Sequence, residues 1–453
     1  MVGGGAAGLT AALALAAAGV EALVLERDPV PRGSTALSAG LIPAAGTRFQ
    51  RERGVSDDTA ERFAADIQAK AHGRASPEVV RAVAEGAAPA VEWLADAHGL
   101  AFSLVHDFDY PGHARRRMHG LPSRSGADLV DALRAAAERA GVAILTDARA
   151  TTLVADRATG APLGLVAARP DGAEERIGCR ALVLACSGYG ADRALVAEHL
   201  PAMRDALYFG HPGNEGHAAR WGAALGARLA DMSGHQGHGS VAHPLGSLVT
   251  WAVLTSGGVQ VDATGARFHD ESRGYSEAAA AVLARPGGVA WCVYDERIAE
   301  VARQFADYRG AEEAGAVLRA EGVEALAAAM RVPARSLAAT LDSASAARRG
   351  DAPDPLGRDF AGLPDLAPPY RAVRVTGALF HTQGGLDVDA RARVLRAADG
   401  SPVPGLYAAG GAARGVSGPD PSGYLSGNGL LTAVVLGRLA GEGAAAPLAG
   451  GGG

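Results

Sequence analysis

A glycine-rich turn at the start of the chain restricts its fold more than any other feature. The first eight residues read Met-Val-Gly-Gly-Gly-Ala-Ala-Gly, a Gly-x-Gly-x-x-Gly pattern directly before an Ala/Leu-rich helix. Gly3 allows a sharp turn, Gly5 lets backbone N–H groups approach a pyrophosphate, and Gly8 lets the helix pack close to its strand. The pattern therefore predicts a dinucleotide site, to which Ala6 and Ala7 also belong.

The end of the following strand supports this prediction. Residues 23–25 form a short apolar run, and Glu26 closes it. A carboxylate at this place suits the 2′-hydroxyl of a ribose and repels a 2′-phosphate, and Arg27 is assigned to the same site. Only two residues precede Gly3, whereas a strand usually has about five. Either the first strand is unusually short, or the start of the chain is set too late.

The size and composition of the chain limit its class. At 453 residues it is too long for one hydrophobic core, which favours two domains. Its three cysteines form neither a close pair nor a metal-binding spacing, and no secretory leader precedes the glycine turn. We therefore expect reduced thiols in a cytoplasmic protein.

Charge and hydropathy exclude two kinds of partner. The longest apolar stretch, 9–25, is explained as a helix followed by a strand, so no membrane span is expected. The net charge of −6, without basic clusters, argues against nucleic acid. We interpret the only basic run, 115–117, as a solvated loop.

The order of the elements predicts the architecture. Residues 128–140 have the pattern of an amphipathic helix, and 142–145 and 180–185 have those of strands. This alternation is typical of a doubly wound α/β domain, whereas short strands, turns and helices follow after about residue 234. We expect an α/β fold of three segments: the first part of a split Rossmann-type domain (1–233), an inserted α+β cap domain for the substrate (234–375), and the second part of the Rossmann-type domain (376–453).

The C-terminal part of the chain predicts a second contact for the same cofactor. Residues 404–411 read as a turn, a short strand and a glycine stop, and an apolar helix begins at Asn428. The N-terminus of that helix offers another site for negative charge. Closure of both parts of the chain on one ligand favours FAD. A second glycine motif between a strand and a helix does not occur, so we expect no nicotinamide domain.

Six stretches of the sequence together resemble one flavoprotein family. They are residues 33–40, 242–244, 265–271, 381–385, 404–410 and 426–429. The family is that of the fumarate reductases, succinate dehydrogenases, urocanate reductases and 3-ketosteroid dehydrogenases, and the resemblance covers nearly the whole chain. It implies FAD in a split domain, with a cap that closes over the flavin. Members that hold FAD covalently use a histidine in the loop that matches 34–40, and this chain has none there, which implies noncovalent FAD.

The motifs and the resemblance together name the remaining cofactor residues. They are Ser34, Thr35, Ser38, Ala39, Gly40, Ala150, Ser187, Gly188, Gly410, Gly411, Ser426, Asn428, Gly429, Leu430 and Leu431. Gly411 stands where the family often has an acid that contacts the ribityl chain, which leaves that contact open. No metal site is expected.

The sequence departs from the fumarate reductases where these bind their substrate. A dicarboxylate needs cationic clamps and an arginine that delivers a proton. The family's catalytic arginine falls on Tyr275, its relay glutamate falls on Trp251, and its carboxylate-binding arginine is replaced within 421–426. Dicarboxylate reduction is therefore not expected. Arg273, two residues from Tyr275, keeps an ene reductase open as the alternative, since a shift of register would restore the proton donor.

Tyrosines in this chain resemble those of the ketosteroid dehydrogenases. Tyr275 matches a tyrosine of the cap, Tyr424 matches one just before the C-terminal flavin helix, and Tyr110 matches a third more loosely. We expect Tyr275 to remove the α-proton of a ketone, with its pKa lowered by Arg273 and Tyr110. Tyr424 and a backbone N–H near Gly427 would bind the ketone oxygen, while flavin N5 accepts the β-hydride.

Five other aromatic side chains also need an interpretation. His381 is assigned to the substrate or the flavin carbonyls, whereas a buried structural role explains His243 equally well. Trp251 is assigned to the substrate wall, where it would favour an apolar ring over a dicarboxylate. His235 and His238 lack a third metal ligand of suitable spacing, so we interpret them as loop histidines.

These residues predict a dehydrogenase that introduces a C=C bond next to the carbonyl of an apolar cyclic ketone, of the 3-ketosteroid or cyclohexanone type. One alternative is an ene reductase of the urocanate or fumarate type with Arg273 as proton donor, and another is a non-catalytic flavoprotein subunit. Because no haem or iron–sulfur pattern occurs, electrons must pass to an external acceptor: oxygen, a quinone or a carrier protein.

Overall fold

The computed structural model describes residues 1–449, which divide into two compact units. The first contains residues 1–195, 210–235 and the chain from 381 onward, and the second contains 196–209 and 236–380. The expected boundaries, 233/234 and 375/376, lie a few residues from this division. Residues 196–209, which the sequence interpretation placed in the first part, group with the second unit. There β10 (Leu207–Tyr208) pairs in parallel with residues 378–379 of β16 (Tyr370–Thr382).

The first unit is built on a parallel sheet. Parallel pairing joins β1 (Leu23–Leu25) to β5 (Ala143–Leu145), and β9 (Leu182–Leu184) to β19 (Pro402–Ala408). Val2 forms parallel bridges to both Leu25 and Leu184, so it lies between β1 and β9 in this sheet. β18 (Arg393–Leu395) adds an antiparallel edge next to β19. In such sheets, ligands bind outside the carboxyl ends of the strands.

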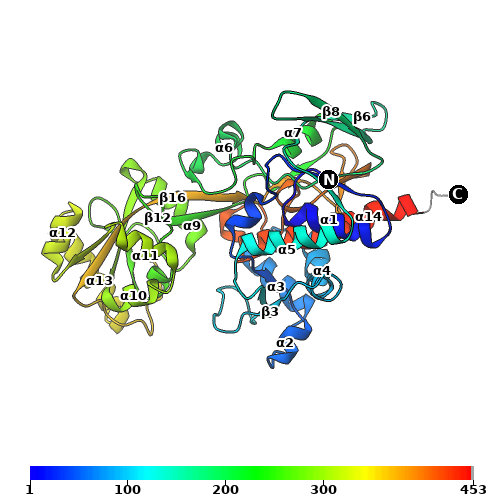
Figure 1. The fold of residues 1–453 in the computed structure, drawn as a ribbon. Helices are drawn as coiled ribbons and strands as arrows, with labels where there is room; N and C mark the ends of the chain where they lie inside the picture. The colour runs from blue at the N-terminus through cyan, green and yellow to red at the C-terminus, as the bar shows by residue number, and fades with distance from the viewer. Residues whose placement is uncertain (450–453) are drawn as a thin grey trace. The chain divides into compact units, whose positions relative to one another are not determined.

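Three helices of the first unit lie side by side: α1 (Ala6–Ala17), α5 (Gly126–Arg139) and α14 (Asn428–Ala449) (Figure 1). Two glycines of α14 allow it to approach α1 closely. A Cβ at Gly437 would lie 2.5 Å from the carbonyl oxygen of Ala7, and one at Gly441 would lie 2.4 Å from that of Ala11. The close packing of these helices brings the two ends of the predicted Rossmann-type domain together.

α14 is also long and apolar enough to cross a membrane, by length and composition alone. Its apolar segment, Asn428–Leu448, is 61% buried inside the protein. This degree of burial is typical of a core helix, and the packing of α14 on α1 accounts for its apolar residues.

Smaller elements complete the first unit. They are η1 (Gly33–Leu37), β2 (Ile42–Pro43), α2 (Arg48–Glu52), α3 (Ala60–Lys70), α4 (Pro77–Asp96), β3 (Ser103–Leu104), β4 (Met118–Gly120), β6 (Arg149–Ala155), β7 (Pro162–Ala168), β8 (Glu174–Gly178), α7 (His217–Ala224), β11 (Leu229–Ala230), β17 (Gly385–Leu386), η4 (Gly410–Ala412) and η5 (Pro421–Gly423). α6 (Arg193–His199) follows β9 and runs into residues of the second unit.

A buried ion-pair cluster lies between α3 and β4. The guanidinium of Arg117 donates to both carboxylate oxygens of Asp58, at 2.7 and 3.0 Å, and to Asp66 at 2.6 Å. The Arg117 side chain is inaccessible to solvent. The interpretation of 115–117 as a solvated loop is therefore wrong for Arg117, because two aspartates from a distant segment neutralise its charge inside the protein.

The fully buried His119 should make the stability of the protein depend on pH. Burial lowers the pKa of His119 from 6.5 to about 4, so the unfolded chain takes up a proton that the folded chain refuses. Stability is then complete above pH 6.5 and falls as the pH drops toward 4, by about 3 kcal/mol from this group. Denaturant unfolding between pH 7 and 4.5 should show a smaller loss for His119→Gln than for wild type. The exposed His72, replaced by asparagine, is the control and should leave the pH dependence unchanged.

The second unit is an α+β layer around the long strand β16. Antiparallel partners of β16 are β14 (Val289–Asp295) and β15 (Val317–Ala320), and β12 (His235–Ala242) pairs with it as well. β13 (Val259–Val261) pairs with β14. The helices of this unit are α8 (Ala252–Thr255), α9 (Tyr275–Leu283), α10 (Glu296–Ala302), α11 (Ala306–Glu313), α12 (Val323–Met330) and α13 (Ala334–Arg349), with η2 (Pro201–Met203) and η3 (Pro286–Gly288).

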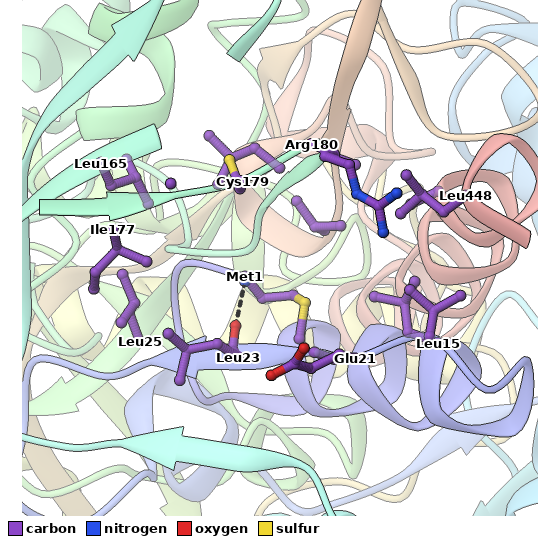
Figure 2. Close-up of a pocket in the computed structure, with 17 residues that line it drawn as sticks. Met1, Leu15, Glu21, Leu23, Leu25, Leu165, Ile177, Cys179, Arg180 and Leu448 are labelled. Atoms are coloured by element: carbon purple, nitrogen blue, oxygen red, sulfur yellow. Dashed lines mark hydrogen bonds between the residues drawn. The ribbon is translucent and has the colours of Figure 1, made fainter. Parts of the chain in front are cut away.

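A cavity of about 530 Å³ lies beside Met1 in the first unit (Figure 2). Residues 20–23, before and within β1, and 178–183, before and within β9, form much of its wall. The amino group of Met1 donates to the carbonyl oxygen of Leu23 at 2.6 Å, and burial lowers the pKa of this amine to about 6. Because the cavity lies at the amino ends of the parallel strands, it is not the cofactor site.

Candidate active site

The glycine turn forms a backbone cradle at the start of α1. Gly3 has φ = +105°, and a Cβ at Gly8 would lie only 1.9 Å from the carbonyl oxygen of Gly3. Both positions therefore require glycine. The N–H of Ala6 donates to Thr35 Oγ1 at 3.0 Å, and the first turn of α1 contains no acidic residue. The positive end of this helix is thus open to a phosphate.

Glu26 is held in place at the carboxyl end of β1. Its side chain is buried, Oε2 accepts a hydrogen bond from the N–H of Gly4 at 2.7 Å, and Oε1 accepts one from Asp28 at 3.0 Å. Each oxygen keeps a second lone pair for a ribose hydroxyl. Arg27, also assigned to this site, forms an ion pair with Glu215 at 3.1 Å.

The serines and threonine after β1 connect the cradle to its surroundings. The hydroxyl of Ser34 accepts a hydrogen bond from Asn214 at 2.8 Å, and Ser38 donates to the carbonyl oxygen of Thr35 at 2.7 Å. Ser38 Oγ also accepts the N–H of Gly40, which has φ = +66°. Ala39 lies between them, whereas Ala150 is buried in β6. Their assignment to the cofactor stays a prediction.

Two turns far apart in the sequence meet beside α1. A Cβ at Gly410 would lie 3.2 Å from that of Ala7, and one at Gly411 would lie 2.9 Å from the backbone nitrogen of Gly188. An acidic side chain at position 411 therefore has no room. The hydroxyl of Ser187, which has φ = +64°, lies 3.1 Å from the same point. Gly411 therefore lies against the turn of Ser187 and Gly188.

His381 and Tyr424 lie together at the start of α14. Their ring centroids are 5.3 Å apart in an edge-on arrangement, and Tyr424 is buried. A Cβ at Gly429 would come within 3.2 Å of the imidazole, so the glycine leaves room for this ring. Burial lowers the pKa of His381 to about 4, which keeps it neutral near pH 7. Leu430 and Leu431 continue α14, and Leu431 is fully buried.

A chain of hydrogen bonds, which the sequence did not predict, leads from Asn428 to His381. Asn428 Nδ2 donates to Ser417 Oγ at 3.1 Å, and Ser417 donates to Gln383 Oε1 at 2.8 Å. Gln383 Nε2 lies 2.9 Å from His381 Nδ1. Gln383 stands within the 381–385 stretch and was therefore detectable, whereas no pattern in the sequence marks Ser417.

The second unit contains a column of stacked rings. Phe209 stacks on Phe380 with centroids 5.4 Å apart, Phe380 on His238 at 5.4 Å, and His238 on Tyr275 at 5.0 Å. The indole of Trp251 meets His238 edge-on at 5.8 Å. Trp251 and Tyr275 thus belong to one aromatic cluster, although their assignment to the substrate stays a prediction.

The histidines of β12 correct an expectation. His235 and His238 lie in this strand and are buried, so the interpretation as loop histidines is wrong. Burial lowers the pKa of His238 to about 3. The N–H of Ser240 donates to Nδ1 of His238 at 3.3 Å, so the proton of this imidazole is on Nε2. Within residues 1–449, no group of three His, Cys, Asp or Glu side chains is arranged to hold a metal ion.

Two further predicted residues have ordinary surroundings. The side chain of Arg273 is 75% exposed, and it lies 3.8 Å from the carboxylate of Asp270. Tyr110 packs beside Leu41, Val105 and Met118, and burial raises its pKa.

Similarity to known proteins identifies the family to which this architecture belongs. A family model described as FAD binding domain matches residues 1–430. The probable fumarate reductase Ifc3 of Shewanella frigidimarina is 30% identical over 449 residues, which cover 98% of this chain and 74% of that protein. The chain belongs to the FAD-binding flavoprotein family of fumarate reductases and succinate dehydrogenases. It is a FAD-dependent oxidoreductase that acts on CH–CH groups.

The chain is also similar to dehydrogenases of cyclic ketones and to a solved fumarate reductase structure. The 4-oxocyclohexanecarboxylate 2-dehydrogenase of Sinomonas cyclohexanicum is 27% identical over 501 residues, covering 91% of this chain and 87% of that protein. The open conformation of a flavocytochrome c3 fumarate reductase has a TM-score of 0.83 at 29% identity, covering 98% and 77% of the two chains. The 3-ketosteroid Δ4-(5α)-dehydrogenase of Rhodococcus jostii RHA1 has a TM-score of 0.76 at 26% identity, covering 98% and 95%. The predicted family and α/β fold are confirmed.

The residues of the first unit fit FAD. The cradle at Gly3 and Gly8 has no space for a side chain, the start of α1 is open to a pyrophosphate, and Glu26 has free lone pairs for a ribose. The turn before α14 provides a second backbone approach. When bound, FAD supplies the hydride acceptor or donor that CH–CH chemistry needs.

Proposed function

We propose that the protein is a FAD-dependent dehydrogenase that introduces a C=C bond next to the carbonyl of an apolar cyclic ketone, of the 3-ketosteroid or cyclohexanone type. The observation that carries this proposal is the presence of Tyr275 and Tyr424 where a dicarboxylate reductase needs arginines. The ring cluster around Tyr275 and the edge-on His381 beside Tyr424 provide surroundings that suit an apolar ring. The similarity to two ketone dehydrogenases supports the same substrate class.

The two tyrosines would divide the chemistry. Tyr275 would accept the α-proton of the ketone, while Tyr424 and the backbone N–H of Gly427 would hold its oxygen as negative charge develops there. The electron pair of the α C–H bond would become the new C=C bond, and FAD held by the residues of the first unit would supply the acceptor for the β-hydride. His238, which stacks on Tyr275, is neutral near pH 7 because burial lowers the pKa of His238 to about 3.

We further propose that FAD is held noncovalently, that the protein is cytoplasmic, and that an external oxidant takes the electrons. Such an oxidant is needed because a dehydrogenase turns over only when its reduced cofactor is reoxidised. Oxygen, a quinone or a carrier protein would each serve.

Anaerobic mixing with candidate substrates tests the proposal. A 3-ketosteroid or a substituted cyclohexanone should bleach the flavin absorbance, and a dye, but not NAD or NADP, should restore it. Fumarate and urocanate, mixed with chemically reduced enzyme, should leave it reduced. The proposal fails if no ketone of the panel bleaches the flavin while an α,β-unsaturated acid reoxidises it.

An ene reductase of the urocanate or fumarate type is the second candidate, with Arg273 as proton donor. Its support is the 30% identity to a probable fumarate reductase. The exposure of Arg273 speaks against it, because a proton donor in the reaction needs a fixed and desolvated position.

A further inference from the structure

His113 makes a single directed contact with the turn that precedes α14. It lies on the loop between β3 and β4, and its Nε2 is 3.0 Å from the backbone oxygen of Ser426. A carbonyl oxygen only accepts, so Nε2 carries the proton and donates it to this bond. The Nδ1 atom is buried, and no residue of the described part of the chain bonds to it.

Helix α3 holds His113 from the other side. The ring of Phe63 lies 6.1 Å from the imidazole, centroid to centroid. Asp66 accepts the N–H of Ala114 at 2.8 Å and pairs with the buried Arg117 at 2.6 Å. The backbone next to His113 is therefore fixed, and the imidazole is presented to Ser426 at little cost in conformational entropy.

The imidazole is neutral under ordinary conditions. Burial lowers the pKa of His113 to about 4, because it outweighs the opposite effect of the hydrogen bond to Ser426. His113 therefore donates the same hydrogen bond throughout the neutral pH range, and it adds no charge beside the turn.

The acceptor of this hydrogen bond belongs to the same peptide group as the N–H of Gly427. This peptide is trans, so its C=O and N–H point in opposite directions. The bond from His113 therefore aims the N–H of Gly427 away from the imidazole. No residue within 1–449 accepts a hydrogen bond from this N–H.

The neighbouring peptides are held as well. The carbonyl oxygen of Leu425 accepts the N–H of Asn428 at 3.1 Å, and that of Gly427 accepts the N–H of Leu431 at 3.0 Å. Gly427 has φ = +87°, and a Cβ there would lie 2.6 Å from Pro43 Cδ. Of the three carbonyl groups in this turn, that of Ser426 is the one held by a side chain.

We propose that His113 is a positioning residue that acts through the Ser426–Gly427 peptide to hold and polarise the N–H that binds the ketone oxygen. This inference rests on the proposed function, in which Gly427 meets that oxygen. A hydrogen bond to the oxygen of an amide strengthens its N–H as a donor. The gain is greater for an enolate oxygen than for a ketone oxygen, because the enolate carries more negative charge.

Phenols test this role without turnover, since a phenolate presents a ring and an anionic oxygen as an enolate does. Titration calorimetry would compare the binding of 4-nitrophenol to the FAD-loaded enzyme above and below the pKa of the phenol. Wild type should bind the phenolate more tightly. His113→Leu should weaken phenolate binding about 10-fold and leave the neutral phenol within about 2-fold. His113→Gln, whose amide N–H can reach Ser426, should retain most of the phenolate affinity.

His106→Leu is the matched control, because His106 lies on the same loop and is exposed. Its phenolate affinity should equal that of wild type, and FAD content and melting temperature would verify the folding of each variant. Equal phenolate affinity in wild type and His113→Leu overturns the role of His113 and leaves the proposed function intact. If wild type shows no preference for phenolate, the proposed function fails and this inference with it. Equal losses for phenol and phenolate that glutamine does not restore overturn the positioning role.

Discussion

Replacing Gly8 with alanine should greatly weaken the binding of FAD. The new Cβ would lie 1.9 Å from the carbonyl oxygen of Gly3, so α1 must move away from the turn that it positions. A shift of the helix start withdraws the N–H groups that face the pyrophosphate. We expect the affinity for FAD to fall about 100-fold, which corresponds to about 2.8 kcal/mol. Fluorescence titration of the apoprotein with FAD measures this loss directly.

Gly310→Ala is the matched control for this substitution. Gly310 lies inside α11, and an added Cβ would meet no heavy atom within 4 Å. Since alanine has a higher helix propensity than glycine, this variant should gain about 0.5–1 kcal/mol of stability. It should bind FAD like wild type. Unchanged FAD affinity in Gly8→Ala would contradict the tight contact between the turn and α1.

The cofactor half of the site was predictable because its signals are local. Gly3 and Gly8 are required by the backbone of one turn, and Glu26 ends the strand that follows. Each of these constraints acts within a few residues, so a single sequence displays it. The structure adds what is not local: the meeting of Gly411 with Ser187, which depends on two distant turns.

Features made by distant contacts could not be predicted in the same way. The spacing of His235 and His238 suggests a metal site, and without a third ligand both are interpreted as loop residues. The stacking of His238 on Phe380 and Tyr275 depends on the sheet of the second unit, which the local sequence does not reveal. Likewise, nothing in the run 115–117 distinguishes Arg117 from its neighbours. It is buried because Asp58 and Asp66 happen to meet it there.

Tyr275→Phe should cost the enzyme far more activity than Arg273→Ala. If Tyr275 takes the α-proton, loss of its hydroxyl should slow flavin reduction by a ketone about 100- to 10,000-fold, the usual worth of a general base. Arg273 is 75% exposed, so its removal should change the rate less than about 3-fold, in line with other exposed positions. Single-turnover stopped-flow measurements isolate this step from reoxidation. A severe loss in Arg273→Ala with a near-normal Tyr275→Phe would instead support the ene reductase.

Exchange of the α-protons with solvent separates the base from a merely structural tyrosine. In deuterated buffer, with the flavin already reduced so that no hydride can leave, wild type should still exchange the α-protons of a bound ketone, and Tyr275→Phe should not. Tyr424→Phe should slow both exchange and flavin reduction, because both pass through negative charge on the ketone oxygen. Since the two tyrosines would act on one enolisation, their combined loss should be smaller than the product of the single losses. Fully multiplicative losses would mean that the two phenols serve different steps, and the division of chemistry between them would have to be abandoned.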